Sequence, residues 1–316
     1  MTYGPTGARL TRCLIDLWCS MTSLSIRSFA KLNIALDVLD KRPDGYHNIE
    51  SVIQPISLHD LLTVSKCDGE AVSVRSADSA VPSNEGNLAY RAAVLFLEAS
   101  GLIAGIDIEI EKHIPMEAGL GGGSSNAAAA LVALNRLFDE PLSTGNIQRL
   151  CAELGSDVPC FLVGGTAFAE GRGETLTGLP DISLDFIVIK PEFGISTSWA
   201  YKALSGLDRP KRQFSRQVAV AIREGSRDEV IAGMGNDFEM VADFEFPEIV
   251  AIRASLIDSG ADGAMLAGSG SAVFGVYPDS QACDSAYQAL KGRYSRCFRA
   301  RTMLKEEFAT NEFVIR

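Results

Sequence analysis

A glycine-rich loop is the part of this chain whose residue types and spacing best suit chemistry. Residues 115–126 read Pro-Met-Glu-Ala-Gly-Leu-Gly-Gly-Gly-Ser-Ser-Asn, after an alternating strand pattern at 106–110 and before an alanine-rich helical pattern at 127–138. Glycine lets the backbone approach a ligand closely, because it has no Cβ. The helix N-terminus adds unpaired N–H groups and the positive end of a dipole. This order predicts a polyphosphate-binding loop, with the Ser124 and Ser125 hydroxyls available to phosphate or Mg²⁺.

Two common phosphate loops do not match this segment. The chain contains no G-x-x-x-x-G-K-[ST] sequence, and the dinucleotide pattern that starts at Gly119 has Ser124 in place of its third glycine. The alternative without a ligand is a tight helix entry in which Ser125 or Asn126 caps the helix. Three consecutive glycines are conformationally costly for a turn alone, so we favour phosphate binding.

The loop resembles the phosphate-binding motif of the GHMP kinase superfamily, and its variant is closest to the 4-diphosphocytidyl-2-C-methyl-D-erythritol kinase family. Further segments are similar to that family in the correct order, across roughly residues 24–305: 30–36 with 42–47, 154–159 with 164–174, and 267–274. The resemblance implies an α+β fold of two domains. The N-terminal domain would be like domain 2 of ribosomal S5, and the C-terminal domain would be an α/β plait.

The resemblance also implies an activity. Kinases of this family transfer the γ-phosphate of ATP, with Mg²⁺, to the 2-hydroxyl of a small-molecule cytidine diphosphate substrate in non-mevalonate isoprenoid biosynthesis. A mevalonate or homoserine type of kinase and an inactive binding protein of the same fold remain alternatives. The sequence specifies no metal ligands. The implied ATP contacts are Asn87, which a helix cap explains nearly as well, and Pro115, Met116, Glu117, Ala118, Gly119, Leu120, Gly121, Gly122, Gly123, Ser124 and Ser125.

Two charged residues match the catalytic positions of the family. The Asp of Gly-Ser-Asp-Val-Pro takes up the acceptor proton there, which assigns Asp157; without the other motifs it would be a turn cap. Lys31 is its matched partner, and its ammonium would lower the pKa of Asp157 and stabilise charge on the transferred phosphoryl group. Asn33 leaves the same strand face as Lys31, which predicts a donor to the substrate.

Aromatic residues are implied to recognise the cytosine base. Tyr46 and His47 follow a glycine turn and match the base-reading pair of the family, although alone they would be a hairpin aromatic and a surface histidine. Tyr201 weakly matches the opposite aromatic wall. Trp199 and Phe193 are the alternatives for that wall.

The overall composition excludes several classes of function. The 316 residues carry a net charge of −11, which disfavours nucleic-acid binding. Seven scattered cysteines without a C-x-x-C pair, and three histidines, indicate neither a disulfide framework nor a zinc site and predict a cytoplasmic protein. No apolar run is long enough to span a membrane, and we expect a monomer or homodimer. Candidate cations for an anionic substrate are Lys31, Arg42, Lys112, Arg172 and Lys190.

The elements that must position these residues interleave without regular βαβ spacing, which favours α+β over a doubly wound sheet. Strands are predicted at 25–39, 49–57, 106–110, 185–189 and 272–277, with 61–65 and 71–75 paired as a hairpin. Helices are predicted at 87–98, 127–138, 144–154, 216–224, 246–259 and 280–290. We expect domains at 21–180 and 181–316, with residues 1–20 as a disordered extension.

Overall fold

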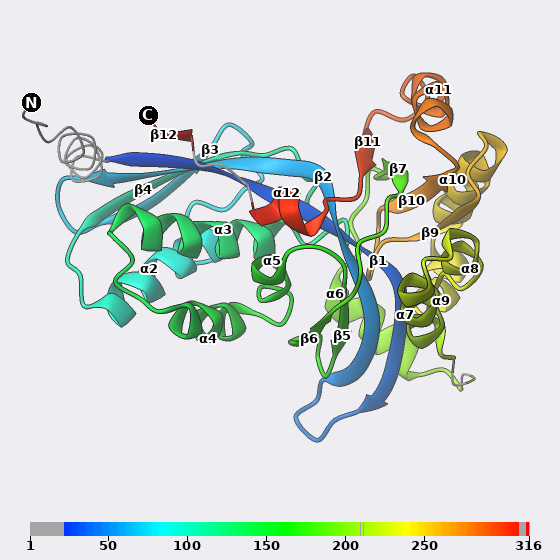
Figure 1. The fold of residues 1–316 in the computed structure, drawn as a ribbon, viewed down its shortest axis with the longest axis horizontal. Coiled ribbons are helices and arrows are strands. Elements are labelled where there is room, and N and C mark those ends of the chain that lie inside the picture. Colours follow the sequence, from blue (N-terminus) through cyan, green and yellow to red (C-terminus); the bar gives the residue numbers. More distant parts are fainter. Residues whose placement is uncertain (1–21, 209, 211, 310–313, 316) are drawn as a thin grey trace, which may run out of the picture.

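The computed structural model describes residues 22–208, 210, 212–309 and 314–315. The predicted extension, residues 1–20, lies outside this part of the chain. Helices and strands interleave around two sheets (Figure 1), which confirms the α+β fold class. None of the described helices is long and apolar enough to cross a membrane.

The strands and helices lie close to most of their predicted bounds. The described strands are β1 (Ser23–Lys41), β2 (His47–Cys67), β3 (Val72–Ser76), β4 (Gly105–Glu111), β5 (Ala167–Glu170), β6 (Thr175–Gly178), β7 (Asp185–Ile189), β8 (Gly235–Asn236), β9 (Gly263–Leu266), β10 (Val273–Tyr277), β11 (Cys297–Arg301) and β12 (Val314–Ile315). The described helices are α2 (Leu88–Ser100), α3 (Gly122–Leu137), α4 (Thr144–Leu154), α5 (Cys160–Val163), α6 (Thr197–Ser205), α7 (Phe214–Glu224), α8 (Arg227–Ala232), α9 (Glu239–Glu245), α10 (Pro247–Asp258), α11 (Ser280–Leu290) and α12 (Lys305–Ala309).

The two long strands β1 and β2 connect the two halves of the molecule (Figure 1). They form an antiparallel pair within a larger sheet of order β12-β1-β2-β4-β3, to which β5, β6 and β8 are added at the side. The second sheet has the order β11-β7-β10-β9. Along the chain, the second sheet begins at β7. The later strands β8 and β12 nevertheless belong to the first sheet, where they pair with β1. The domain bounds at 180 and 181 therefore stay a prediction.

The predicted hairpin of 61–65 with 71–75 is wrong. β2 pairs with β4, and β3 lies beside β4 in parallel register, with Val72 opposite Ile106. β4 lies between β2 and β3, and its Ile106, Ile108 and Ile110 are buried. The residues predicted as separate strands at 49–57 and 61–65 form one strand, β2. This strand has a bulge opposite the step from Phe29 to Ala30 of β1.

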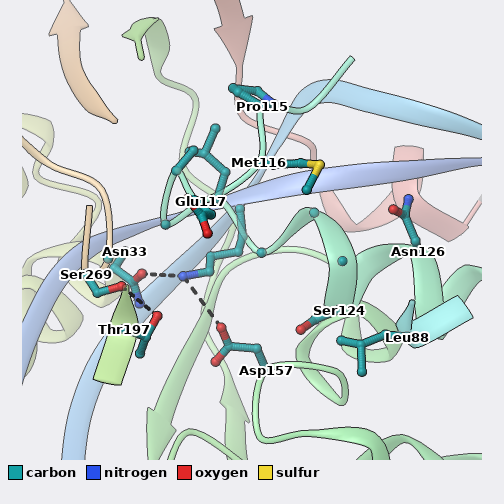
Figure 2. Close-up of a pocket in the computed structure, with 18 of the residues that line it drawn as sticks. Asn33, Leu88, Pro115, Met116, Glu117, Ser124, Asn126, Asp157, Thr197 and Ser269 are labelled. Atoms are coloured by element: carbon teal, nitrogen blue, oxygen red, sulfur yellow. Dashed lines mark hydrogen bonds and ion pairs between the residues drawn. The ribbon is translucent and has the colours of Figure 1, made fainter. Parts of the chain in front are cut away.

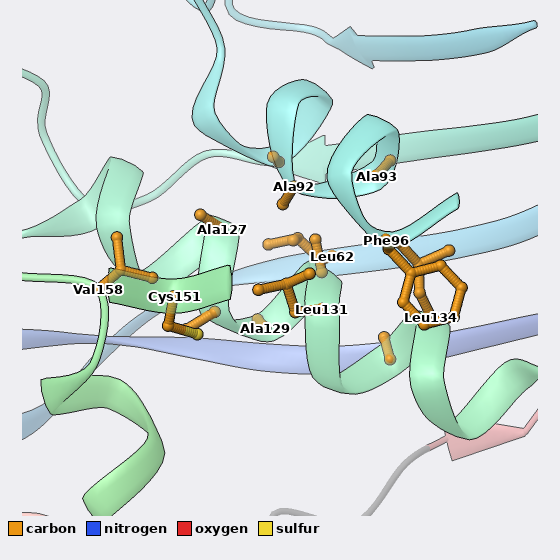
Figure 3. Packing of buried hydrophobic residues seen from close by; sticks show 14 of the residues in the cluster. Leu62, Ala92, Ala93, Phe96, Ala127, Ala129, Leu131, Leu134, Cys151 and Val158 are labelled. Atoms are coloured by element: carbon orange, nitrogen blue, oxygen red, sulfur yellow. The ribbon is translucent and has the colours of Figure 1, made fainter. Parts of the chain in front are cut away.

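The helices α2, α3 and α4 pack together over the larger sheet and form an apolar core (Figure 3). Phe96 of α2 and Leu134 of α3 are fully buried in it. Alanines at 127–130 are also buried, and their small side chains let α3 lie close to its neighbours. The helix that follows the glycine loop is therefore held rigidly by packing.

A buried carboxylate on β1 fastens the second half of the chain to the first. Asp37 accepts hydrogen bonds from the backbone N–H groups of Phe214 (3.1 Å) and Ser215 (2.8 Å), at the start of α7. These N–H groups have no partner within the helix, and the negative charge suits a helix N-terminus. Asp37 thus caps α7 from another element, because the N-cap residue Gln213 makes no side-chain cap.

Candidate active site

The glycine loop lines a cavity of about 440 Å³ between the two halves of the molecule. β1 contributes Lys31 and Asn33, and the turn after α4 contributes Asp157 (Figure 2). Ser269, from the loop before β10, completes the opposite wall. The structure therefore brings together residues from all four sequence motifs that carried the family resemblance.

The helix after the loop starts earlier than predicted, at Gly122 instead of residue 127. Gly121 is its N-cap, with φ of +70° and no side-chain cap. The predicted start was too late because it followed the low helix propensity of glycine, which tertiary contacts outweigh. At Gly121 a Cβ would lie 2.9 Å from Phe161, so the close packing there requires glycine. The glycines thus form the first turn of α3, where N–H groups lack an intrahelical partner and can bind an anion.

The loop that carries the third family motif packs directly on the glycine loop. The backbone N–H of Ala272 donates to the carbonyl of Ala118 at 3.2 Å. Gly119 has φ of +76°, and a Cβ there would overlap the carbonyl oxygen of Ala267. Asn236 holds the motif from behind through two amide hydrogen bonds, to the carbonyls of Leu266 (2.9 Å) and Gly268 (2.8 Å). Gly119 is therefore required for packing as well as for any ligand.

Lys31 and Asp157 face each other across the cavity. The Lys31 Nζ lies 3.9 Å from Asp157 Oδ2 and donates to Asn33 Oδ1 at 2.6 Å (Figure 2). The lysine side chain is 5% exposed and the aspartate side chain 45% exposed. A fixed ammonium and an accessible carboxylate can together orient a hydroxyl, accept its proton and stabilise negative charge on a phosphoryl group.

Asn33 positions the lysine. Its Nδ2 donates to Ser51 Oγ at 2.7 Å, and that hydroxyl donates in turn to the carbonyl of Ala35 at 2.7 Å. The chain of bonds orients the Asn33 oxygen toward Lys31. The carboxamide has two N–H bonds, so one more donor is available for the predicted contact with the substrate.

The two serines of the loop point in different directions. Ser124 lines the cavity, whereas the Ser125 hydroxyl is buried and accepts a hydrogen bond from Ser28 at 2.7 Å. Successive residues of a helix are about 100° apart around its axis, which follows from 3.6 residues per turn. The early helix start therefore turns the Ser125 hydroxyl away from the cavity, and its contact with ATP stays a prediction.

Asp60 anchors both ends of the glycine loop, and this role was not predicted from the sequence. Its Oδ1 accepts the backbone N–H groups of His113 and Ile114, both at 2.7 Å. Its Oδ2 accepts Lys112 Nζ at 2.8 Å and Asn126 Nδ2 at 2.9 Å. Burial lowers the pKa of Lys112, and the charge of Asp60 opposes that shift. The sequence signal was weak, because Asp60 lies in a strand that carries several other polar and charged residues.

Replacing Asp60 with Asn should destabilise the fold. The carboxylate is 0% exposed, and the change leaves the buried Lys112 ammonium without its counter-charge. Breaking a buried pair in this way costs about 3–5 kcal/mol. Chemical denaturation should show the loss in free energy of unfolding. The double variant with Lys112→Met should recover part of it, and a single variant of wild-type stability would contradict the anchoring role.

A second cavity, of about 630 Å³, adjoins the first and shares Asp157 and Tyr201 with it. Tyr46 and His47 line it as well. The His47 ring stacks on Tyr201 with centroids 5.3 Å apart and an 18° angle, and Ser205 Oγ lies 3.0 Å from His47 Nε2. Burial and the charge of Asp157 raise the pKa of Tyr201. The rings touch each other, so a base that inserts between them must first separate them.

The other aromatic candidates lie elsewhere. Phe193 stacks on Phe246 at 5.0 Å, and Trp199 meets the same ring edge-on at 5.3 Å. Neither lines the two cavities. Asn87 lines the first cavity and also caps α2, with its Oδ1 accepting the Ala89 N–H at 2.9 Å. Both of its predicted roles are thus compatible with its position.

Three of the five candidate cations line the first cavity: Lys31, Lys112 and Arg172. Lys190 does not, because its buried ammonium donates to the carbonyls of Pro191 and Phe193. Arg42 forms an ion pair with Asp44 at 3.1 Å on the turn before β2. The positive charge available to an anionic ligand therefore gathers around the glycine loop and Asp157.

Two family models match separate parts of this chain. Residues 87–165 match the family model of the GHMP kinase N-terminal domain, and residues 218–296 match that of the GHMP kinase C-terminal domain. The chain is 44% identical to 4-diphosphocytidyl-2-C-methyl-D-erythritol kinase of Pelotomaculum thermopropionicum, over 84% of this chain and 92% of that protein. It is 39% identical to the enzyme of the same name from Moorella thermoacetica, over 90% of this chain and all of that protein.

Solved structures show the same likeness. A crystal structure of 4-(cytidine 5'-diphospho)-2C-methyl-D-erythritol kinase superposes with a TM-score of 0.76 at 33% identity, covering 88% of this chain and 99% of that one. Mevalonate kinase of L. major, in complex with R-mevalonate, has a TM-score of 0.72 at 14% identity, covering 89% of this chain and 96% of that one. The second match shows a shared fold only.

Proposed function

Because this chain belongs to the GHMP kinase family, among the 4-diphosphocytidyl-2-C-methyl-D-erythritol kinases, we propose that its site transfers the γ-phosphate of ATP to the 2-hydroxyl of that cytidine diphosphate alcohol. The family and the kinase activity predicted from the sequence are confirmed. The observation that supports the site assignment is the Lys31–Asp157 pair, 3.9 Å apart beside the glycine loop. The reaction serves the non-mevalonate route to isoprenoid precursors.

Asp157 would take the proton of the acceptor hydroxyl and orient its oxygen for attack. Phosphoryl transfer places most of its demand on positioning and charge stabilisation, so the buried Lys31 ammonium supports the reaction by stabilising the charge that spreads over the phosphoryl oxygens. Asn33 would keep the ammonium aimed at the cavity through its 2.6 Å bond. The partly exposed carboxylate can reach a substrate without any rearrangement of the backbone.

ATP would lie along the glycine loop, with its phosphates at the N-terminus of α3. The N–H groups of Gly122, Gly123 and Ser124 begin that helix, and anions bind at such ends. No group of three or more His, Cys, Asp or Glu side chains within the described residues could hold a metal ion. Mg²⁺ commonly binds through one or two protein oxygens and substrate phosphates, which fits the Ser124 hydroxyl in the cavity as a holder; when bound, Mg²⁺ would neutralise phosphate charge.

A panel of acceptor alcohols tests this function directly. The protein would be mixed with ATP and Mg²⁺ and with each of 4-diphosphocytidyl-2-C-methyl-D-erythritol, its uridine analogue, mevalonate and homoserine. We expect rapid ADP formation with the cytidine substrate alone. Efficient phosphorylation of mevalonate or homoserine would show that the proposed substrate is wrong, although the protein would still be a kinase.

The cytosine base would bind at the His47–Tyr201 pair, in contact with both rings. Stacking contributes on the order of 1–3 kcal/mol per base, so His47→Ala and Tyr201→Ala should each raise KM for the cytidine substrate roughly 5–150-fold. KM for ATP should hardly change. Steady-state kinetics with each substrate varied would show this. Phe244→Ala removes an exposed aromatic of α9 outside both cavities and is the control; equal increases in both KM values would contradict base recognition.

The cellular location and the oligomeric state of the enzyme remain part of the proposal. The described cysteines Cys67, Cys151, Cys160, Cys283 and Cys297 are all free thiols, which supports a reducing cytoplasm. Burial raises the pKa of Cys151 to about 12, so this thiol is poorly suited to act as a nucleophile. We expect the protein to act as a monomer or homodimer on a small-molecule substrate, without nucleic acid.

A further inference from the structure

We propose that Arg172 binds the diphosphate group of the acceptor substrate. The inference rests on the proposed function, which places a cytidine base at one end of the acceptor and the reacting hydroxyl at the other. Arg172 lines both cavities, the one that holds Lys31 and Asp157 and the one that holds the His47–Tyr201 pair. The diphosphate joins those two ends of the substrate, so it must pass this guanidinium.

The backbone around Arg172 is built to hold it at this junction. Residues 170–174 read Glu-Gly-Arg-Gly-Glu, and both glycines have positive φ, +74° at Gly171 and +110° at Gly173. The Gly171 carbonyl accepts the N–H of Ile49 at 2.7 Å, which ties the turn to β2 beside His47. On its other side, a Cβ at Gly173 would lie 3.7 Å from Asp157 Oδ1. The turn thus lies between the base-binding pair and the catalytic carboxylate.

The side chain is oriented but keeps hydrogen-bonding capacity. Its Cζ lies 5.1 Å from the centroid of the Tyr46 ring, a cation–π contact that holds the guanidinium beside this ring. Its Nε forms an ion pair with Glu174 at 3.8 Å, which is beyond hydrogen-bonding distance, and has no hydrogen-bond acceptor among the described residues. Unpaired buried donors are rare. The guanidinium also has terminal N–H groups that can donate to a phosphate oxygen from a side chain that is 35% exposed.

Electrostatics also favours an anion at this place. The chain has a net charge of −11, so a diphosphate needs local positive charge. A guanidinium offers a planar pair of donors that matches phosphate geometry, which a lysine ammonium lacks. Lys31 and Lys112 are engaged with Asn33 and Asp60. Arg172 is 35% exposed at its side chain and so is accessible to the substrate.

Calorimetry with substrate fragments tests this role separately from catalysis. Cytidine and cytidine diphosphate would be titrated into the protein saturated with a non-hydrolysable ATP analogue, so that the acceptor site alone is sampled. The wild type should bind the diphosphate more tightly than the nucleoside. Arg172→Met should reduce that preference roughly 10–100-fold, and Arg172→Lys should keep an intermediate preference because it retains the charge without the paired donors.

The ratio of the two affinities separates binding of the diphosphate from support of the Tyr46 ring. Loss of ring support alone would weaken cytidine and cytidine diphosphate equally, and an unchanged ratio would overturn the proposal. Weaker binding of the ATP analogue with an unchanged ratio would also overturn it, because Arg172 would then serve the nucleotide. Arg149→Met, which removes an exposed arginine of α4, should behave as the wild type. A wild type that binds neither fragment would instead refute the substrate assignment itself.

Discussion

Asp157→Asn should lower kcat roughly 10²–10⁴-fold, the range expected when a general base is removed. The carboxylate is the one in the described cavity that faces a buried ammonium, with Lys31 Nζ at 3.9 Å. Asparagine has nearly the same shape but cannot take up the proton of the acceptor hydroxyl. Steady-state and single-turnover phosphotransfer with ATP and the cytidine substrate would measure the effect, and the affinities for both should change little.

Glu153→Gln is the matched control for this substitution. Glu153 lies on α4, close in sequence to Asp157, and pairs only loosely with Arg149 at 3.8 Å on the exposed face. Neutralising it should leave kcat at the wild-type value. Near-native turnover in Asp157→Asn would show that the hydroxyl loses its proton elsewhere, and the catalytic assignment would then be wrong.

Gly123→Val should abolish measurable ATP binding while the protein stays folded. Gly123 is the second residue of α3 and lines the cavity; a Cβ there has only one neighbouring atom within 4 Å, Leu88 Cδ1 at 3.8 Å. The valine side chain would therefore occupy the space of the nucleotide without striking the protein. At Gly122 the same Cβ would meet Ile114 at 3.0 Å and Lys112 Nζ at 3.1 Å, so loss of binding there would be mixed with misfolding.

The control for this variant has the same local structure. Gly145 is the second residue of α4, and its nearest potential neighbour is Ser143 Oγ at 4.0 Å. Gly145→Val introduces the same side chain into a first helical turn far from the cavity. Isothermal titration with ATP and thermal unfolding should show normal binding in Gly145→Val and none in Gly123→Val, at similar Tm. Normal ATP binding in a folded Gly123→Val protein would refute the phosphate-loop assignment.

The sequence by itself predicted the parts of the proposed site that are local. A strand, a run of glycines and a helix are consecutive in the chain, so the composition of residues 115–138 was enough to predict an anion-binding loop. Lys31 and Asp157 were assigned through resemblance to a family, because neither has a neighbour in sequence that explains its chemistry. The structure places their charged groups 3.9 Å apart, as the resemblance requires.

The sequence could not predict the directions in which the two serine side chains of the loop point. Ser124 and Ser125 are equivalent in composition, yet one faces the cavity and the other bonds to Ser28. The outcome depends on where α3 begins: it starts at Gly122, after Gly121 with φ of +70° in close contact with Phe161. Helix propensity alone predicts a later start, since glycine is a poor helix former.

Strand partners and buried polar contacts were decided only by the tertiary structure. The sequence identified β3 and β4 as strands but not that β3 lies parallel to β4, because that pairing joins segments about 34 residues apart, Val72 opposite Ile106. Asp60 meets Lys112 and Asn126 from positions 52 and 66 residues away along the chain. Local composition determines what a segment can do and which element it forms, whereas long-range packing determines which groups meet, because burial and hydrogen bonding are satisfied by the whole fold at once.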